Sequence, residues 1–385
     1  MTMPDHQKFG AGHSLLFVIN DPAFWLSHRK NLGIAAREAG FSVTIAAPED
    51  VGRKEIEELG FGFISLQSLS RWKMNPLTEL QSIAELSRVY RTLKPDIVHH
   101  VTIKPVLYGS IAARISNTPA VVNSVSGLGH VFLSHGLKAT LRRALVHIAY
   151  GFAAQHQRQC MIFQNRSDLE LFTSRGLVPR KDTILIPGSG VSGDLFTATQ
   201  EPSGEPVVLL PARFLVDKGL REFAGAAKIL KSEGVKARFV LIGDSALGNP
   251  AAVPKEEIDA WCNEGFIEAH PYSTDMPRIF SRSHIICLPS YREGFSKALI
   301  EALASARPIV TTKVPGCADA VVEGVNGLLV PPRDIQALAS ALRLLIAEPA
   351  LRREMGGASR ILFKEMQVDE GAIVKRIMRI YEEML

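Results

Sequence analysis

Short apolar segments alternate with amphipathic segments along this whole chain, and this pattern restricts the possible folds more than any other feature. The apolar segments have strand length and lie at Ser14–Asn20, Val43–Ala46, Ile97–His100, Pro119–Ser124, Val207–Leu210, Phe239–Ile242, Ile285–Leu288 and Ile309–Thr311. These apolar segments are followed by segments in which apolar residues recur at helical spacing. Strands that alternate with helices predict parallel sheets covered by helices on both faces, so we expect an α/β fold.

Helix boundaries are marked by capping residues. We expect a helix at Ser27–Ala39, with Ser27 well placed to cap it and Gly40 ending it. A second helix is predicted at Glu49–Leu59. Asn75 and Pro76 make a good N-cap and first-turn pair, so a long helix is predicted to begin there.

The alternation breaks at residues 187–190 and again at residues 197–206, which are rich in Pro, Gly, Ser and Thr. The length of 385 residues also exceeds that of a typical single domain. We therefore predict two doubly wound domains, at residues 1–190 and 191–366, followed by a terminal helical segment at residues 367–385. Ligands of such sheets bind beyond the carboxyl ends of the strands.

Composition excludes several classes of protein. Hydrophobic residues make up 46% of the chain and charged residues 22%, which argues against disorder. No apolar run is long enough to span a membrane, and residues 1–10 lack the apolar core of a signal peptide. The four cysteines form no Cys-x-x-Cys pair, so neither a disulfide framework nor a structural zinc site is expected. These features favour a cytoplasmic protein.

The positive charge is concentrated in the first half. Residues 1–190 hold 21 Lys and Arg against 14 Asp and Glu, a net charge of +7, and the remainder holds 23 against 25, a net charge of −2. This indicates an anionic partner, although a solvated basic face is the alternative. Nucleic acid is disfavoured, because the basic residues are not interleaved with a stacking platform.

A cluster of polar residues follows two predicted strands of the second half. Glu293 and Gly294 come after Ile285–Leu288, and the backbone N–H groups of Phe295, Ser296 and Lys297 are expected at a helix N-terminus, which favours a phosphate. Glu301 lies two turns later on the same side of that helix, although two glutamates at this spacing also occur by chance. Arg213 and Lys218 follow Val207–Leu210 and can neutralise a diphosphate, or they are ordinary surface residues.

Together these motifs resemble the GT-B, family-4 retaining glycosyltransferases. Glu293 and Glu301 match the Glu-x7-Glu motif of that family, Arg213 and Lys218 match its donor-diphosphate pair, and residues 187–191 match its interdomain linker. The resemblance covers nearly the whole chain. It implies two Rossmann-like domains facing each other across a cleft, with the first binding the acceptor, the second binding the nucleotide sugar, and the terminal helix crossing back to the first.

The resemblance also implies roles for the residues of the second domain. Arg213 and Lys218 would bind the diphosphate of a UDP-sugar, Glu293 would contact the transferred sugar, and Glu301 would bind the ribose. The remaining donor contacts would come from Gly294, Phe295, Ser296, Lys297 and the loop at His270. The chain contains no Asp-x-Asp sequence, so we expect no obligate metal and no other cofactor, because Arg213, Lys218 and the helix N-terminus can stabilise the leaving group.

The first half resembles a narrower, PglA-like branch, whose members extend sugars linked to undecaprenyl diphosphate. The resemblance lies in residues 20–29, 99–105 and 125–130, and it implies an acceptor site formed by Asn20, Phe24, Ser27, His28, Arg29, His100, Lys104 and His130. The chain departs from the family by having aromatic residues in place of a glycine-rich loop after the first strand. The histidines are alternatively buried, hydrogen-bonded core residues.

We therefore predict a retaining glycosyltransferase that moves an N-acetylhexosamine or hexose from a UDP-sugar to a lipid-diphosphate-linked saccharide. The alternatives are a UDP-sugar 2-epimerase of the same fold and a non-catalytic sugar-binding protein. At residues 135–155, Lys138, Arg142 and Arg143 lie beside apolar residues at helical spacing. This pattern predicts a helix at an anionic membrane surface on the cytoplasmic side, or alternatively an ordinary helix packed on the core.

Overall fold

The computed structural model describes residues 8–69, 75–127, 151, 155–245 and 249–385. The chain forms two compact units. Unit 1 comprises residues 1–189 and 373–385, and unit 2 comprises residues 190–372. None of the helices within the described ranges is long and apolar enough to cross a membrane.

Unit 1 is built on a seven-stranded parallel sheet with the strand order β3-β2-β1-β4-β5-β6-β7. The strands are β1 (Ser14–Val18), β2 (Ser42–Pro48), β3 (Gly62–Leu66), β4 (Ile97–Val101), β5 (Ala120–Val125), β6 (Gln159–Phe163) and β7 (Thr183–Leu185). Its described helices are α1 (Pro22–His28), α2 (Lys30–Glu38), α3 (Arg53–Glu58), α4 (Pro76–Leu93), α5 (Ser110–Ile115), α7 (Arg166–Ser174) and the end of α14 (Glu370–Glu383). The order reverses between β1 and β4, so the carboxyl ends of these two strands mark the switch point where such sheets bind ligands.

Unit 2 repeats this architecture with six parallel strands in the order β10-β9-β8-β11-β12-β13. They are β8 (Val207–Pro211), β9 (Arg238–Ile242), β10 (Glu268–His270), β11 (Ile285–Leu288), β12 (Ile309–Thr312) and β13 (Gly327–Val330). The helices are α8 (Leu220–Ser232), α9 (Lys255–Asn263), α10 (Met276–Ser281), α11 (Lys297–Ala304), α12 (Ile335–Ala347) and α13 (Pro349–Glu365). Two Rossmann-like units confirm the predicted fold class.

The predicted start of the helix at Ser27–Ala39 is wrong. The helix begins at Pro22, and the Asp21 carboxylate caps it by accepting the Phe24 N–H at 3.1 Å. Ser27 is not a cap, because its hydroxyl donates to the Ala23 carbonyl one turn earlier. The backbone then breaks at Arg29 and continues as α2. The predicted start at Asn75 is confirmed: its side chain accepts the Leu77 N–H.

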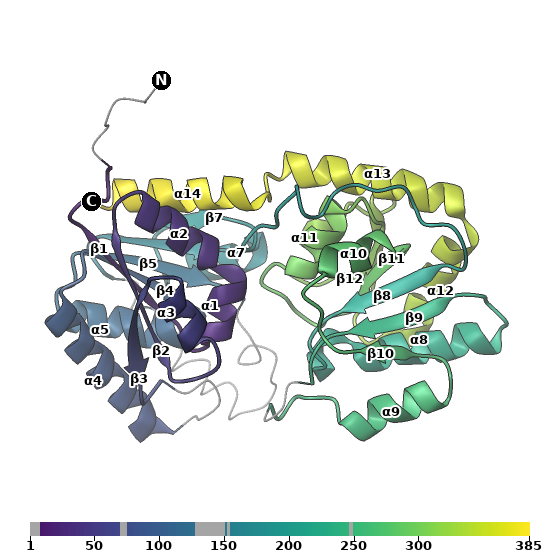
Figure 1. Ribbon diagram of the computed structural model, residues 1–385, viewed down its shortest axis with the longest axis horizontal. Coiled ribbons are helices and arrows are strands. Elements are labelled where there is room, and N and C mark those ends of the chain that lie inside the picture. Colours follow the sequence, from purple (N-terminus) through teal and green to yellow (C-terminus); the bar gives the residue numbers. More distant parts are fainter. Residues whose placement is uncertain (1–7, 70–74, 128–150, 152–154, 246–248) are drawn as a thin grey trace. The chain divides into compact units, whose positions relative to one another are not determined.

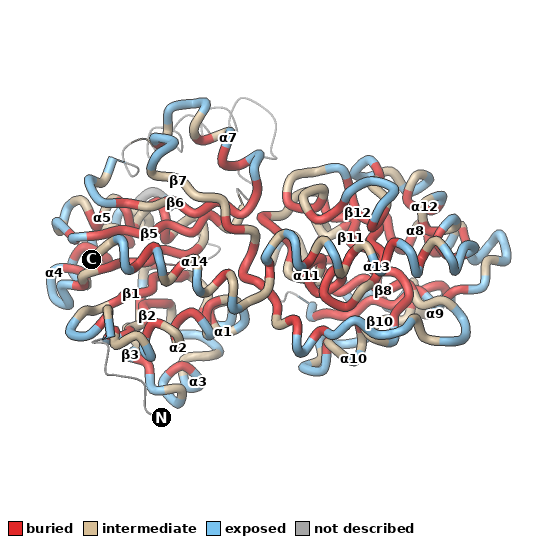
Figure 2. Tube along the Cα trace, turned by 90° about the horizontal axis from the view of Figure 1, so that it is seen from above, coloured by how far each residue is buried: buried red, intermediate tan, exposed pale blue. Residues whose placement is uncertain are grey.

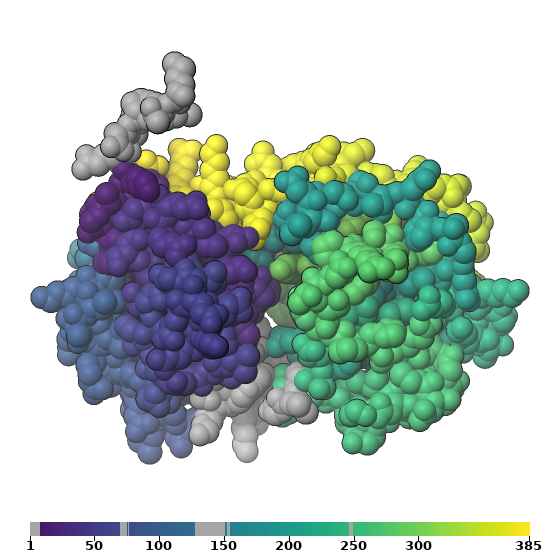
Figure 3. All heavy atoms as spheres, viewed as in Figure 1, coloured from purple at the N-terminus to yellow at the C-terminus, as the bar shows by residue number. Residues whose placement is uncertain are grey.

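Both sheets are buried on their two faces, and the central strands are almost fully enclosed (Figure 2). In unit 1 the last helix completes this core. Ile373, Ile377 and Tyr381 of α14 pack with Phe17 and Phe41, and Figure 3 shows this last helix, in yellow, beside the purple part of unit 1. The Tyr381 hydroxyl also hydrogen-bonds Nδ1 of His99 in β4.

The chain enters and leaves unit 2 through two adjacent segments. Val191 and Asp369 form a parallel bridge, in which the Val191 N–H donates to Val368 and the Glu370 N–H donates to Val191. The Asp369 carboxylate also accepts the Gly193 N–H at 3.0 Å. The two connections are therefore held side by side within unit 2.

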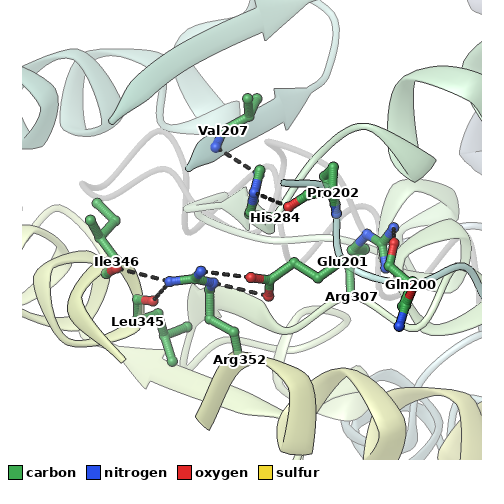
Figure 4. Close-up of polar contacts among 9 residues, drawn as sticks. All are labelled: Gln200, Glu201, Pro202, Val207, His284, Arg307, Leu345, Ile346 and Arg352. Atoms are coloured by element: carbon green, nitrogen blue, oxygen red, sulfur yellow. Dashed lines mark hydrogen bonds and ion pairs between the residues drawn. The ribbon is translucent and has the colours of Figure 1, made fainter. Parts of the chain in front are cut away.

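Residues 197–206, where the strand–helix alternation is interrupted, are fastened to unit 2 (Figure 4). Arg352 donates to both carboxylate oxygens of Glu201, at 3.1 and 2.6 Å, and Arg307 donates to the Thr199 carbonyl at 2.9 Å. His284 accepts the Val207 N–H at Nδ1 and donates from Nε2 to the Pro202 carbonyl, which fixes its neutral tautomer. This segment is part of unit 2 and is not a free linker.

Candidate functional site

The carboxyl edge of the unit 2 sheet brings two loops together. Arg213 and Lys218 lie after β8, and Glu293 lies after β11. Gly219 has a φ of 75°, and a Cβ there would lie 2.2 Å from the Pro289 carbonyl oxygen, so only glycine permits this approach of the loops.

Lys218 and Glu293 form a direct ion pair. Nζ of Lys218 lies 2.5 Å from Oε1 of Glu293, and their side chains are only 18% and 12% exposed. Arg213, in contrast, is exposed and makes no ion pair with any residue in the described ranges. The sequence analysis placed all three residues in one site and assigned Lys218 and Glu293 to different parts of the donor. The structure brings these two side chains together in a pair that was not predicted.

Tyr291 was missed by the sequence reasoning. Its N–H donates to the Asp217 carbonyl at 2.8 Å, and its hydroxyl donates to Glu222 at 2.6 Å, so it ties the loop after β11 to the loop after β8. It lies two residues before Glu293 and thereby fixes the position of that residue. An aromatic residue directly after a predicted strand gives no local sign of such a role.

The helix that follows Glu293 begins later than the sequence suggested. α11 begins at Lys297, Ser296 is its N-cap residue without a side-chain cap bond, and Phe295 and Ser296 are buried. The Glu293 N–H donates to the Pro315 carbonyl at 3.1 Å, so the backbone of Glu293 belongs to a fixed loop. Glu293 therefore lies four residues before the first residue of this helix.

Glu301 lies on α11 with its side chain buried. Burial raises the pKa of its carboxyl group to about 7, and the positive charge of Lys297 opposes this rise. Burial raises the pKa of Tyr272, and the charge of the Glu301 carboxyl adds to this rise. His270 is exposed at the end of β10, and its carbonyl accepts the Gly243 N–H at 3.1 Å.

Glu301→Gln is expected to stabilise unit 2 above pH 7. Because the pKa is raised in the folded state, the wild-type protein loses stability as the pH rises from about 4.5 to about 7, and a glutamine does not. The gain at pH 8 is roughly 3 kcal/mol in the free energy of unfolding, and it is absent at pH 4.5. Urea unfolding at both pH values measures it.

Glu268→Gln is the control, because the hydrogen bond from Arg238 lowers the pKa of Glu268 and its replacement is expected to destabilise. An equal stability change for Glu301→Gln at the two pH values would contradict the buried carboxyl group.

In unit 1, Asn20 lies at the switch point after β1, together with a residue that the sequence analysis did not single out. Thr102, directly after β4, donates from its hydroxyl to the Asn20 Oδ1 at 2.8 Å. Its φ is 75°, a strained conformation for a β-branched residue, and such strain gathers at functional sites. Lys104, two residues further on, is paired with Glu79 at 3.3 Å.

Three predicted acceptor residues share α1. The rings of Phe24 and His28 are stacked, with centroids 4.0 Å apart and planes 4° from parallel. The Ser27 hydroxyl contacts Nδ1 of His28 at 2.7 Å. Arg29, at the break after α1, is instead turned inward: it is 3% exposed, and burial lowers its pKa to about 10.

His100 does not lie at the surface as an acceptor-binding residue must. Its ring is fully buried, contacting Tyr90 at 2.9 Å and Asn123 at 2.7 Å, and burial lowers its pKa to about 4. The prediction of an acceptor contact is corrected here, because β4 is a central strand covered on both faces. The predicted acceptor residue His130 lies outside the described residues. The same holds for the basic residues of the predicted membrane helix, Lys138, Arg142 and Arg143.

Comparison with known proteins identifies the family. The model of glycosyl transferase 4-like proteins matches residues 15–165, and that of glycosyl transferases group 1 matches residues 193–361. The chain is a GT-B glycosyltransferase. The fold agrees: the structure of Anabaena Alr3699/HepE in complex with UDP-glucose superimposes with a TM-score of 0.76 and 18% identity, covering 96% of this chain and 99% of that one.

Two curated relatives refine the comparison for this glycosyltransferase. It is 27% identical to the N,N'-diacetylbacillosaminyl-diphospho-undecaprenol alpha-1,3-N-acetylgalactosaminyltransferase of Campylobacter jejuni, over 91% of this chain and 93% of the relative. It is 24% identical to the UDP-Gal:alpha-D-GlcNAc-diphosphoundecaprenol alpha-1,3-galactosyltransferase of Escherichia coli, over 69% of this chain and 70% of the relative. The transferase prediction is confirmed over the epimerase and sugar-binding alternatives.

Proposed function

We propose that this glycosyltransferase moves an N-acetylhexosamine or hexose from a UDP-sugar to a saccharide linked to undecaprenyl diphosphate, with retention at the anomeric carbon, in the assembly of a bacterial surface or glycoprotein glycan. The match that carries this proposal is the Campylobacter relative, which acts on a diphospho-undecaprenol-linked sugar and aligns over 91% of this chain. The Escherichia coli relative combines a UDP-sugar donor with the same class of acceptor.

We assign the donor to unit 2. Arg213, Lys218 and the N-terminus of α11 bind the diphosphate, Glu293 contacts the sugar, Glu301 binds the ribose, and the loop at His270 holds the base. In the reaction the bond between the anomeric carbon and the β-phosphate oxygen breaks, and a bond to the acceptor oxygen forms. The leaving phosphate, stabilised by the two cations, takes the proton of the acceptor hydroxyl.

We assign the acceptor to unit 1. Asn20 and Thr102 offer polar groups at the switch point, and the stacked rings of Phe24 and His28 offer an apolar face of the kind on which a sugar ring packs. The lipid of such an acceptor stays in the bilayer, so we place the enzyme at the cytoplasmic face of the membrane. The basic helix predicted at residues 135–155 is the proposed anchor.

The test is a transfer assay with labelled UDP-sugars and a polyprenyl-diphosphate-linked monosaccharide, carried out with and without excess EDTA. We expect a lipid-linked disaccharide with the α-anomer of the transferred sugar, as NMR of the product can establish. Transfer should persist in EDTA, because cationic side chains and backbone donors stabilise the leaving group. Loss of transfer in EDTA with rescue by magnesium or manganese would contradict the leaving-group assignment. Absence of transfer from every UDP-sugar would contradict the function.

A further inference from the structure

The two cations assigned to the donor diphosphate differ in their charge balance. Lys218 is neutralised by Glu293 in a pair that is mostly shielded from water, and Arg213 is exposed without an ion pair within the described part of the chain. A partly buried pair of this kind interacts much more strongly than one on the surface. A diphosphate that binds here therefore contacts Arg213 with its full positive charge and Lys218 with a charge that Glu293 already compensates.

The carboxylate of Glu293 and a diphosphate compete for the same ammonium group. Two anions at one cation repel each other, so strong binding of the diphosphate requires that Glu293 turns away from Lys218. The backbone of Glu293 is held by its N–H bond to Pro315, and a Cβ at Gly316 would lie 2.3 Å from the Glu293 carbonyl oxygen. The movement that resolves the competition is therefore a rotation of the side chain and not a displacement of the loop.

We infer that Glu293 exchanges partners during the reaction cycle and that this exchange lets the site distinguish a UDP-sugar from UDP. The inference rests on the proposed function. With a UDP-sugar bound, Glu293 accepts hydrogen bonds from hydroxyls of the sugar and leaves Lys218 to the diphosphate. After transfer the sugar is gone, so Glu293 returns to Lys218 and weakens the binding of UDP. The ion pair thus favours donor over product and promotes release of the product.

A double-mutant cycle on UDP affinity tests the exchange. Calorimetric titration with UDP compares the wild type with Glu293→Gln, Lys218→Met and the double variant. Glu293→Gln is expected to bind UDP about tenfold more tightly, because Lys218 is then free for the diphosphate. In the Lys218→Met background, the same glutamine substitution is expected to change UDP affinity by less than about twofold.

Glu257→Gln is the matched control, because it removes a carboxylate of unit 2 that pairs with Arg221 and not with Lys218. It should leave UDP affinity unchanged. Glu293→Ala provides a second variant in which Lys218 has lost its ion pair with Glu293. The melting temperature of each variant shows whether it is folded.

Unchanged or weaker UDP binding by both Glu293 variants overturns the exchange. The exchange is also overturned if Glu293→Gln raises UDP affinity as much in the Lys218→Met background as in the wild type, because that result indicates general charge repulsion. Neither outcome affects the proposed function as long as the wild type binds UDP and transfers sugar. A wild type that binds no UDP overturns both.

Discussion

Replacing Arg213 by alanine is expected to lower kcat by a factor of about 10² to 10³, with an unchanged melting temperature. The loss corresponds to removal of one charged donor that stabilises the leaving group, on the order of 2–4 kcal/mol. Folding is spared because the side chain is exposed and has no ion pair with the described residues. Steady-state kinetics of sugar transfer and differential scanning fluorimetry measure the two effects.

Lys218→Ala is expected to cost as much activity and also some stability, because it leaves the shielded Glu293 carboxylate without its cation. The double variant should lose more than either single variant but less than the product of the two losses, since both groups act on one diphosphate. Near-normal turnover by a folded double variant would contradict the diphosphate assignment.

Arg352→Ala is expected to destabilise unit 2 by about 3–5 kcal/mol, the cost of leaving one partner of a buried ion pair unpaired. The side chains of Arg352 and Glu201 are only 4% and 13% exposed. The same guanidinium also donates to the carbonyls of Leu345 and Ile346 near the end of α12, which would lose their donor (Figure 4). Urea unfolding followed by circular dichroism measures the change.

A second Arg–Glu ion pair, which is exposed to solvent, provides the control. Arg343 donates two bonds to the Glu233 carboxylate with similar geometry, but their side chains are 40% and 42% exposed. Arg343→Ala should cost less than about 1 kcal/mol. Glu201→Gln, introduced into the Arg352→Ala variant, should recover part of the loss because it removes the unpaired charge. Equal losses for the two arginine variants would show that burial of the pair does not determine its contribution.

The fold was predictable from the sequence because parallel strands covered on both faces leave nearly continuous apolar runs, such as those of β1, β8 and β11. The sequence analysis missed β3, β6, β7, β10 and β13, of which β6 is a largely buried apolar run that was overlooked, whereas β7 and β10 carry weaker signals. β7 and β10 have only three residues each and are partly exposed, so neither the length nor the apolarity of a central strand is present.

The errors near α1 have a physical origin. Asp21 and Pro22 form an N-cap and first-turn pair as good as Asn75 and Pro76, yet the helix was placed from Ser27. The interruption at Arg29 depends on tertiary packing, which buries this arginine, and no local sequence signal announces it. The positions of Arg213, Lys218 and Glu293 in the fold were easier to predict, because they follow from strand ends and a helix start.

The burial of His100 and the strain of Thr102 could not be predicted in the same way. Neighbouring residues of a strand point to opposite faces, but helices cover both faces of β4, so the rings of His99 and His100 are both buried. The left-handed backbone conformation of Thr102 is uncommon for a β-branched residue, so the residue type did not indicate it.

The last helix has a consequence for how the protein is made on the ribosome. Unit 1 is assembled from both ends of the chain, and the bond between His99 and Tyr381 joins residues 282 positions apart. Tyr381 follows unit 2 in the chain, so it is synthesised only after the whole of unit 2. Unit 2 is one continuous stretch, so it can fold before unit 1 acquires its complete core. Until then, the apolar residues that pack with this helix, among them Phe17 and Phe41, lack part of their cover.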